Sequence, residues 1–297
     1  MKLHLVDATY ELFRAHYAPR PPVLGRDGVE LSGVSGVVEQ LLYLLREEGA
    51  THVGCATDHV IESFRNDLWP GYKSSAGMPP ELLAQFPVVE DAIRALGLVV
   101  WPMIEFEADD AIAAACERFV DAPDVEQVVV CTPDKDMAQL VRDSTVVLLD
   151  RRRRITYDDV AVIAKWGVRP PSIPDWLALV GDSADGFPGL PGWGAKSAAA
   201  VLFRYGSLEG IPARASAWEV PSLRGGSGLA ATLREQWDDA ILFRSLARLR
   251  TTSDGVVIPE ATVDALAWRG APRGAWQAFC DRWGLDRLRD RPHRWVA

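Results

Sequence analysis

The first half of the chain alternates short apolar segments with longer amphipathic ones. Valine-rich apolar segments predict strands at residues 3–6, 52–57, 98–101, 127–132 and 145–149. Helical periodicity predicts helices at residues 34–48, 81–96 and 108–119. Strands that alternate with helices usually form a mostly parallel sheet covered by helices. The alternation therefore predicts an α/β fold, and few other architectures accommodate it.

The second half has a different pattern, in which helices and loops follow one another without strands. Its predicted helices are residues 157–165, 173–180, 196–204 and 229–249. We therefore expect two domains, residues 1–160 and residues 161–297. The tryptophan-rich end of the second domain, residues 259–297, is also expected to be helical.

Composition narrows the class of protein. Hydrophobic residues make up 48% of the chain, and no segment has the ~20 consecutive apolar residues that a membrane-spanning helix needs. The start of the chain, residues 1–7, has no apolar signal core, so we expect no membrane association and a cytoplasmic location. The four cysteines are not spaced as metal ligands and are expected to be buried thiols.

The net charge of −9 argues against a nucleic-acid partner, unless the acids are gathered in a site that cations neutralise. Ligands of parallel α/β sheets bind beyond the carboxyl ends of the strands. Acidic residues follow each of the first four predicted strands: Asp7, then Asp58, then Glu107, Asp109 and Asp110, then Asp134 and Asp136. A single acid at such a place is usually a turn or cap residue. Four consecutive strand ends favour one common site.

A further acidic pair, Asp182 and Asp185, follows the predicted helix 173–180. A solvated turn explains this pair equally well when it is taken alone. Carboxylates that crowd together raise one another's pKa unless cations compensate them. Oxygen ligands without histidine or cysteine suit Mg²⁺ or Mn²⁺, and two such ions ~4 Å apart can activate a water for phosphodiester hydrolysis.

Four motifs now stand in a recognisable order: residues 5–7 (LVD), 106–110 (FEADD), 132–136 (TPDKD) and 181–185 (GDSAD). Their order and spacing resemble the bacterial 5′-nuclease family, which comprises flap endonucleases and the 5′–3′ exonuclease domain of bacterial DNA polymerase I. The similarity covers about residues 1–250. It implies a PIN-like core with a mostly parallel sheet and flanking helices, in a stand-alone protein that is expected to be a monomer.

The resemblance also implies two metal clusters. Asp7, Asp58, Glu107, Asp109 and Asp110 would serve the first cluster, and Asp134, Asp136, Asp182 and Asp185 the second. Two or more Mg²⁺ or Mn²⁺ ions would bind there.

Two basic residues match positions that lie near the reacting phosphate in the 5′-nuclease family. Lys73 matches the lysine that contacts the scissile phosphate, and Arg14 matches a basic residue near the site. Residues 59–80 have no clear periodicity, and long loops of this kind are usually functional or mobile. By resemblance, residues of about 59–86 would form the arch through which single-stranded 5′ ends thread, and Tyr72 would contact DNA. A solvated loop lysine is the alternative for Lys73.

A glycine-rich segment, residues 189–198 (GLPGWGAKSA), resembles the helix–three-turn–helix of the same family, at about residues 173–205. Its expected DNA-binding residues are Gly189, Gly192, Gly194, Lys196 and Ser197. Glycines let a backbone approach a phosphate, and the free N–H groups of the next helix can bind it. The resemblance further implies K⁺ at this turn. A simple Gly/Pro turn between helices is the alternative.

Other acid-based families fit less well. A haloacid-dehalogenase-type phosphatase needs a second acid where this chain has Thr9, and a Toprim domain has a glutamate where this chain has Asp7. A small PIN ribonuclease lacks the arch and the glycine-rich segment, and a DNA-binding member without activity would have lost acids. We therefore expect a metal-dependent 5′–3′ exonuclease or flap endonuclease. Its substrate would be DNA with a 5′ flap, a nick or an RNA primer, in replication and repair.

Overall fold

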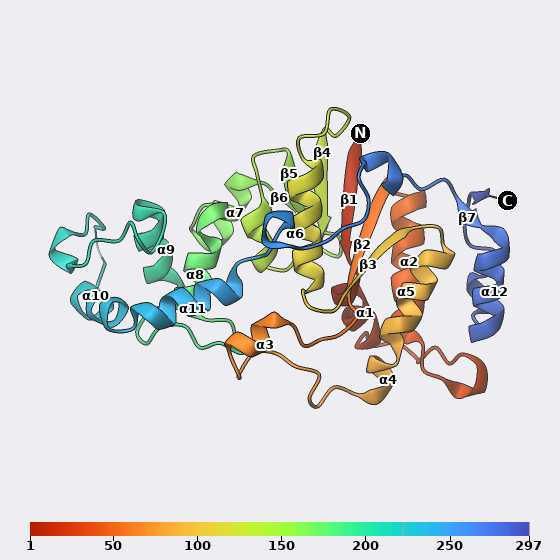
Figure 1. The fold of residues 1–297 in the computed structure, drawn as a ribbon, viewed down its shortest axis with the longest axis horizontal. Helices are drawn as coiled ribbons and strands as arrows, with labels where there is room; N and C mark the ends of the chain where they lie inside the picture. Colours follow the sequence, from red (N-terminus) through yellow and green to blue (C-terminus); the bar gives the residue numbers. More distant parts are fainter. Residues whose placement is uncertain (222, 297) are drawn as a thin grey trace. The chain divides into compact units, whose positions relative to one another are not determined.

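The computed structural model describes residues 1–221 and 223–296, and it divides into two compact units (Figure 1). Unit 1 consists of Met1–Ile61, Ser75–Thr132 and the chain from Arg250 onward. Unit 2 consists of Glu62–Ser74 and Pro133–Leu249. Each unit thus combines segments that are far apart in the sequence. The domain boundary expected near residue 160 stays a prediction.

Unit 1 is built on four parallel strands in the order β3-β2-β1-β4. They are β1 (Lys2–Asp7), β2 (His52–Asp58), β3 (Val99–Met103) and β4 (Gln127–Cys131). Val6 pairs with Cys55 on one side and Cys131 on the other, so the carboxyl ends of the strands reach one edge of the sheet. The strands follow the predicted segments closely, because strands covered on both faces are apolar throughout.

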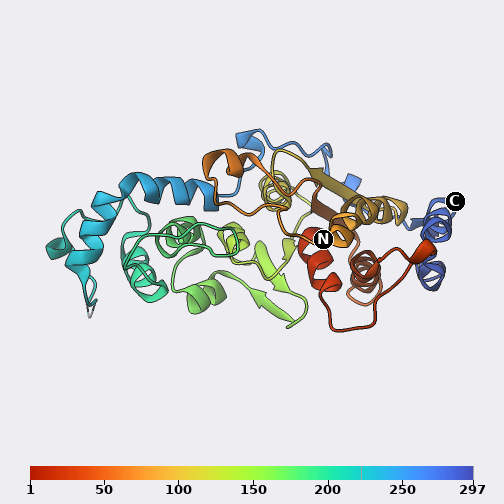
Figure 2. The same cartoon turned by 90° about the horizontal axis from the view of Figure 1, so that it is seen from below.

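Helices cover this sheet and one another. The longer ones are α1 (Ala8–His16), α2 (Ser32–Arg46), α5 (Gln85–Ala95), α6 (Ala108–Phe119) and α12 (Arg273–Trp283). Helix α6 packs on β1 to β4, α5 packs on β2 and β3, and α2 packs on α1 and α5. Helix α12, dark blue in Figure 2, lies beside α5. The segment from residue 259 onward, expected to be helical, is only partly so, because it also contains the short strands β7 (Ala271–Pro272) and β8 (Trp295–Val296).

The predicted helix at residues 81–96 is interrupted. It consists of α4 (Pro80–Leu83) and α5, which meet at Ala84. Pro87 has no N–H to donate to the carbonyl group of Leu83, four residues earlier, so the helical hydrogen bond is missing at this point.

Unit 2 holds a strand pair and a set of helices. Strands β5 (Val146–Asp150) and β6 (Ile155–Tyr157) are antiparallel. The helices are α3 (Phe64–Leu68), α7 (Asp159–Trp166), α8 (Ile173–Val180), α9 (Ala195–Tyr205), α10 (Gly226–Glu235) and α11 (Trp237–Ala247). Helices α8 and α11 pack against each other (Figures 1 and 2).

Three expectations for unit 2 need correction. The predicted helix at residues 229–249 is two helices, because Gln236 leaves helical geometry at φ −115° and ψ 35°. The helix expected from residue 157 starts two residues later, since Tyr157 belongs to β6 and Asp158 caps α7 by accepting a bond from the Ala161 amide. The aperiodic segment contains α3, which Ser63 and Asn66 start with a capping box.

All four cysteines are buried free thiols, as expected. Within the described residues, none of the helices combines the length and the apolar character that crossing a bilayer requires.

Candidate metal and nucleic-acid site

The acids of unit 1 follow the strand ends and accept hydrogen bonds there. Asp7 caps α1 by accepting a bond from the Tyr10 amide at 2.8 Å, and its second oxygen accepts a bond from the Thr132 hydroxyl at 3.1 Å. Asp58 accepts a bond from the amide of Ala108, the first residue of α6, at 2.6 Å. Helix starts favour negative charge, so the fold itself stabilises both carboxylates.

Asp110 is the most enclosed acid of this set, with 0% of its surface exposed. One carboxylate oxygen accepts a bond from the Glu107 amide at 3.0 Å, and the other accepts one from the Arg250 amide at 2.7 Å. Asp110 thus joins the start of α6 to the returning C-terminal segment. Glu107 is the buried N-cap of α6, and Asp109 is half-buried in its first turn.

In unit 2, Asp136, Asp182 and Asp185 form a cluster in which one carboxylate oxygen of each lies within 4.8 Å of the others. We call these three residues the acid cluster. Asp136, the last residue of the TPDKD motif, opens a short 3-10 helix, and the other two lie in the turn after α8. Asp134 is half-buried and accepts a bond from the Asp136 amide at 3.1 Å. The structure thus brings together three of the four residues expected for the second metal region.

The turn that presents Asp182 and Asp185 is closed by its own backbone. The Asp182 amide donates to the Phe187 carbonyl at 2.8 Å, and the Phe187 amide donates back at 3.0 Å. Asp182 Oδ1 accepts a further bond from the Ala184 amide at 3.0 Å. A closed turn of this kind fixes where both carboxylates point.

Two lysines lie against the acid cluster. Lys135 Nζ forms an ion pair with Asp182 and lies 3.6 Å from Asp136 Oδ1. Lys73 Nζ lies 3.3 Å from Asp185 Oδ1. Lys135 was not among the residues predicted for the site, although it stands between two of them in the TPDKD motif.

Burial raises the pKa of Asp136 well above its ordinary value, and the neighbouring carboxylates of Asp134 and Asp185 raise it further. Burial also lowers the pKa of Lys135, but Asp136 and Asp182 outweigh this effect and raise it above its ordinary value. Negative charge at this place is therefore only partly compensated by the protein.

The acid cluster fits a hard divalent cation. Its donors are all carboxylate oxygens, which Mg²⁺ and Mn²⁺ prefer. Asp136 Oδ1 is buried and has no hydrogen-bond partner within the part of the chain that the structure describes, since the Lys135 ammonium at 3.6 Å is too far away to donate one. A buried oxygen in that state is costly unless a cation or a water satisfies it. Among residues 1–221 and 223–296, no comparable group of three is formed by the five acids predicted for the first metal cluster, which are Asp7, Asp58, Glu107, Asp109 and Asp110.

The two basic residues predicted for the site belong to different units. Arg14 lies on α1 in unit 1 and is paired with the buried Glu11, with Nε 3.0 Å from Glu11 Oε2. Lys73 belongs to unit 2 with the acid cluster. Tyr72, expected to contact DNA, has only 5% of its surface exposed, so the protein covers most of its side chain.

The glycine-rich segment forms the turns between α8 and α9. At Gly189, φ is +70°, and a Cβ would lie 2.3 Å from the Gly181 amide nitrogen, so only glycine fits. The Leu190 amide donates to the Leu179 carbonyl at 2.9 Å, which folds the segment back onto α8. Gly189 therefore closes the turn, and any contact with DNA would be made by its backbone.

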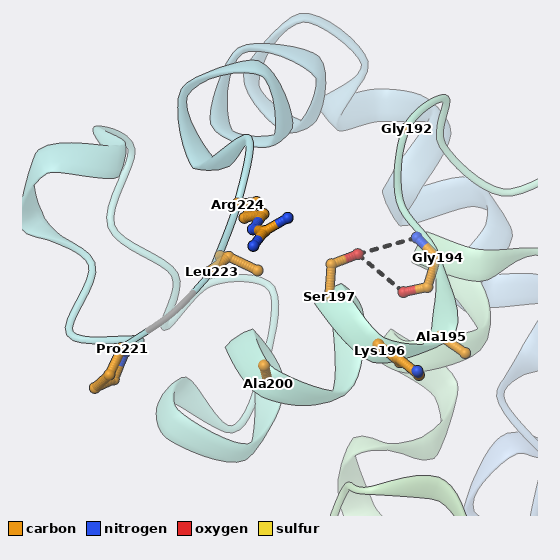
Figure 3. A pocket seen from close by; sticks show the side chains of 9 residues that line it. All are labelled: Gly192, Gly194, Ala195, Lys196, Ser197, Ala200, Pro221, Leu223 and Arg224. Atoms are coloured by element: carbon orange, nitrogen blue, oxygen red, sulfur yellow. Dashed lines mark hydrogen bonds between the residues drawn. The ribbon is translucent and has the colours of Figure 1, made fainter.

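An open pocket of about 600 Å³ lies at the start of α9 (Figure 3). Its lining includes Gly192, Gly194, Lys196 and Ser197, with Arg224 on the opposite side. The Ser197 hydroxyl accepts a bond from the Gly194 amide and donates one to its carbonyl, both at 3.0 Å. Lys196 and Arg224 are exposed. Four of the five residues predicted to hold a phosphate thus line one pocket, and Arg224 was not predicted because it follows 28 residues after Lys196 in a segment without periodicity.

Comparison with known families covers most of the chain. Residues 2–167 match the N-terminal resolvase-like domain of 5′-3′ exonucleases, and residues 168–271 match their C-terminal SAM fold. These two matches confirm the expected fold class and the resemblance found in the motifs.

Two curated relatives illustrate the similarity. DNA polymerase I of Mycobacterium leprae is 36% identical over 252 residues, which cover 83% of this chain and 27% of that protein. The 5′-3′ exonuclease of Aquifex aeolicus is 31% identical over 210 residues, which cover 70% of this chain and 71% of that protein. The chain spans about a quarter of the length of the polymerases that it matches.

Solved structures share the fold. A flap endonuclease of bacteriophage T5, in a complex with DNA and metal ions, has a TM-score of 0.63 at 19% identity, covering 83% of this chain and 89% of that one. The 5′-exonuclease of the same phage with bound zinc has a TM-score of 0.65 at 18% identity, covering 95% and 98%.

Proposed function

Since the chain belongs to the 5′-3′ exonuclease family, we propose that it is a metal-dependent nuclease that hydrolyses phosphodiester bonds at 5′ ends of DNA. Its substrates would be duplexes with a 5′ flap, a nick or an RNA primer, in replication and repair. The observation that supports this most directly is the acid cluster with Lys73 beside it.

We assign the divalent ions to Mg²⁺ or Mn²⁺. One metal region would be formed by Asp134, Asp136, Asp182 and Asp185. The other would be formed by Asp7, Asp58, Glu107, Asp109 and Asp110. Two such ions supply a water of lowered pKa and stabilise the departing oxygen of a phosphodiester. Relatives from bacteriophage T5 whose structures contain metal ions, zinc in one of them, support a metal site, and the all-oxygen donors favour Mg²⁺ or Mn²⁺ in it.

The basic residues would act on the phosphate. Lys73 carries a positive charge beside Asp185, so its ammonium group would offset the charge that develops on the phosphoryl oxygens. Arg14 is fixed by Glu11 and would orient a neighbouring phosphate.

The pocket at the start of α9 would hold the duplex. Gly192, Gly194, Lys196 and Ser197 would bind one backbone phosphate, since backbone N–H groups at a helix start attract anions. Contacts of this kind position a duplex without reading its sequence. Gly189 would shape the turn, Tyr72 would contact DNA through the small part of its surface that is exposed, and K⁺ at this turn remains a prediction from the resemblance.

The remaining expectations concern the whole protein. We propose that it acts as a monomer in the cytoplasm, with residues of about 59–86 as the arch and residues 1–160 and 161–297 as the two domains. DNA is the proposed partner because a solved relative was determined as a complex with DNA.

A cleavage assay tests the function. The double variant Asp136→Ala with Asp182→Ala should cut an end-labelled 5′-flap duplex about 10³-fold more slowly in Mg²⁺, because a lost metal contact removes several kcal/mol of transition-state stabilisation. Asp238→Ala is the matched control, since Asp238 is an exposed acid on α11 in the same unit and should leave the rate unchanged.

Three outcomes would contradict the proposal. A double variant as active as the wild type would remove the acid cluster from the mechanism. Cleavage of free RNA in preference to the flap would indicate a PIN-type ribonuclease. Tight binding of the flap without cleavage in either metal would indicate a DNA-binding module.

A further inference from the structure

The segment that carries Lys73, residues 62–74, belongs to unit 2 although the residues before and after it belong to unit 1. Its first anchor is Arg65, which is 1% exposed and donates bonds to the Leu246 carbonyl at 2.8 Å and the Arg248 carbonyl at 3.1 Å. A positive charge is favourable at the end of a helix such as α11. The segment is thus held firmly at its start.

Trp69 is the second anchor and reaches the turn of the acid cluster. Its indole N–H donates a hydrogen bond to the Gly186 carbonyl at 3.0 Å. Its ring lies edge-on against Phe243, with the ring centroids 5.4 Å apart at 87°. Gly186 directly follows Asp185, so this bond connects the Lys73 segment to the backbone that presents a carboxylate of the cluster.

Gly186 allows the two backbones to meet. Its φ is +83°, and a Cβ at this position would lie 2.0 Å from the Gly71 carbonyl oxygen. Any other residue would push Gly71 away from the turn. The close approach and the Trp69 bond therefore belong to the same contact.

The main chain of Lys73 is fixed on both sides. Its amide donates to the Asp185 carbonyl at 3.0 Å, and its carbonyl accepts a bond from the Asn66 side chain at 3.0 Å. From this fixed main chain the side chain extends so that Nζ lies 3.3 Å from Asp185 Oδ1. The position of the ammonium group therefore depends on how the segment is held.

We propose that Trp69 is a positioning residue: its bond to Gly186 holds Lys73 at the acid cluster. The proposal rests on the proposed function, in which Lys73 acts on the scissile phosphate. Trp69 would act through Gly186 and the Lys73 main chain, without contact with the DNA. A displacement of a catalytic group by about 1 Å can cost ~10²-fold in rate.

A double-mutant cycle tests this proposal. Trp69→Phe keeps an aromatic ring against Phe243 and removes the N–H donor. We expect kcat on the 5′-flap duplex to fall roughly 10- to 100-fold with KM nearly unchanged. In a Lys73→Ala background, Trp69→Phe should not lower kcat any further, because Trp69 acts through Lys73.

Trp268→Phe is the matched control. Trp268 donates an indole bond of 2.9 Å to the Leu96 carbonyl in unit 1, so its replacement removes a similar bond away from Lys73. This variant should keep the wild-type kcat and KM. A Trp69→Phe rate loss of equal size with and without Lys73 would overturn the proposal, because it would indicate a general effect on the fold.

A second measurement does not depend on activity. The chain has five lysines, so reductive ¹³C-methylation gives a small set of NMR signals that Lys→Arg variants can assign. Trp69→Phe should shift the Lys73 signal and leave those of Lys2 and Lys165 in place. An unchanged Lys73 signal would overturn the positioning proposal even in an active enzyme. If the wild-type protein cuts none of the substrates but Trp69→Phe still shifts the Lys73 signal, the proposed function is overturned and the positioning of Lys73 by Trp69 is supported.

Discussion

The two units hold their acids in different ways. In unit 1, Asp7, Asp58 and Asp110 accept hydrogen bonds from backbone amides, and two of them sit at helix starts. In unit 2, Asp136, Asp182 and Asp185 face one another and two lysines. The net negative charge of the chain, −9, falls entirely on unit 1, while unit 2 has slightly more basic than acidic residues.

The difference separates two uses of the same side chain. A carboxylate that accepts amide bonds is stabilised in its ionised form and at the same time holds the fold together. A buried carboxylate among other carboxylates depends mainly on cations, even though Asp182 also accepts one bond from the Ala184 amide. Acids that look alike in the sequence are therefore expected to respond differently to mutation, pH and metal.

The largest expected effect on stability is in unit 1. Asp110→Ala would leave the buried Glu107 amide and the partly buried Arg250 amide without their acceptor, and each such loss costs about 1–3 kcal/mol. We expect the free energy of unfolding to fall by about 3 kcal/mol, measured by urea denaturation without metal. The neighbouring Asp109→Ala should cost about 0.3–1 kcal/mol, the value typical of an acid in a first helical turn. Equal costs would contradict the structural role assigned to Asp110.

The next largest expected effect is on the pH dependence of stability, through Asp136 in unit 2. Because the pKa of Asp136 is raised in the folded protein, the folded state keeps a proton that the unfolded state releases above about pH 4. This group should therefore lower the stability of the metal-free protein as the pH rises from about 4 toward the raised pKa. Thermal unfolding in EDTA should show this decrease in the wild type and a weaker one in Asp136→Asn. A divalent ion should reverse it. A wild-type curve that matches the Asp136→Asn curve would contradict the assignment.

The smallest expected effect is at the start of α9. Lys196→Ala should weaken duplex binding a few-fold and lower the slope of log K against log salt by about one, because one phosphate contact is lost. Fluorescence anisotropy at several salt concentrations measures this slope. Lys165→Ala is the control in the same unit, since Lys165 lies over the Tyr157 and Trp166 rings and should leave the slope unchanged. Equal slopes for both variants would remove Lys196 from the phosphate site.

The sequence predicted the sheet well and the helix ends less well. Buried strand segments such as residues 128–131 are apolar throughout, which makes them easy to recognise. The helix break at Gln236 contains no proline or glycine that would predict it, and β6 is only three residues long. Local patterns contain no signal for such features, because packing decides them.

The motifs predicted which acids matter, but they could not predict their partners. In the structure, Asp136 of the TPDKD motif lies near Asp182 and Asp185 of the GDSAD motif. The bond from Trp69 to Gly186 joins residues 117 positions apart, and that from Arg65 to Leu246 joins residues 181 apart. Neither residue belongs to a periodic pattern or a motif, so only the folded structure reveals these contacts.

The central claim is that Asp136, Asp182 and Asp185 form a divalent-cation site. The direct test is a crystal of the protein soaked in Mn²⁺, with anomalous scattering recorded near the manganese absorption edge. The account predicts an anomalous peak with carboxylate oxygens of these three residues as ligands, and its loss in the Asp136→Asn and Asp182→Asn double variant. A fully soaked crystal without a peak at this place, or with an unchanged peak in the double variant, would contradict it.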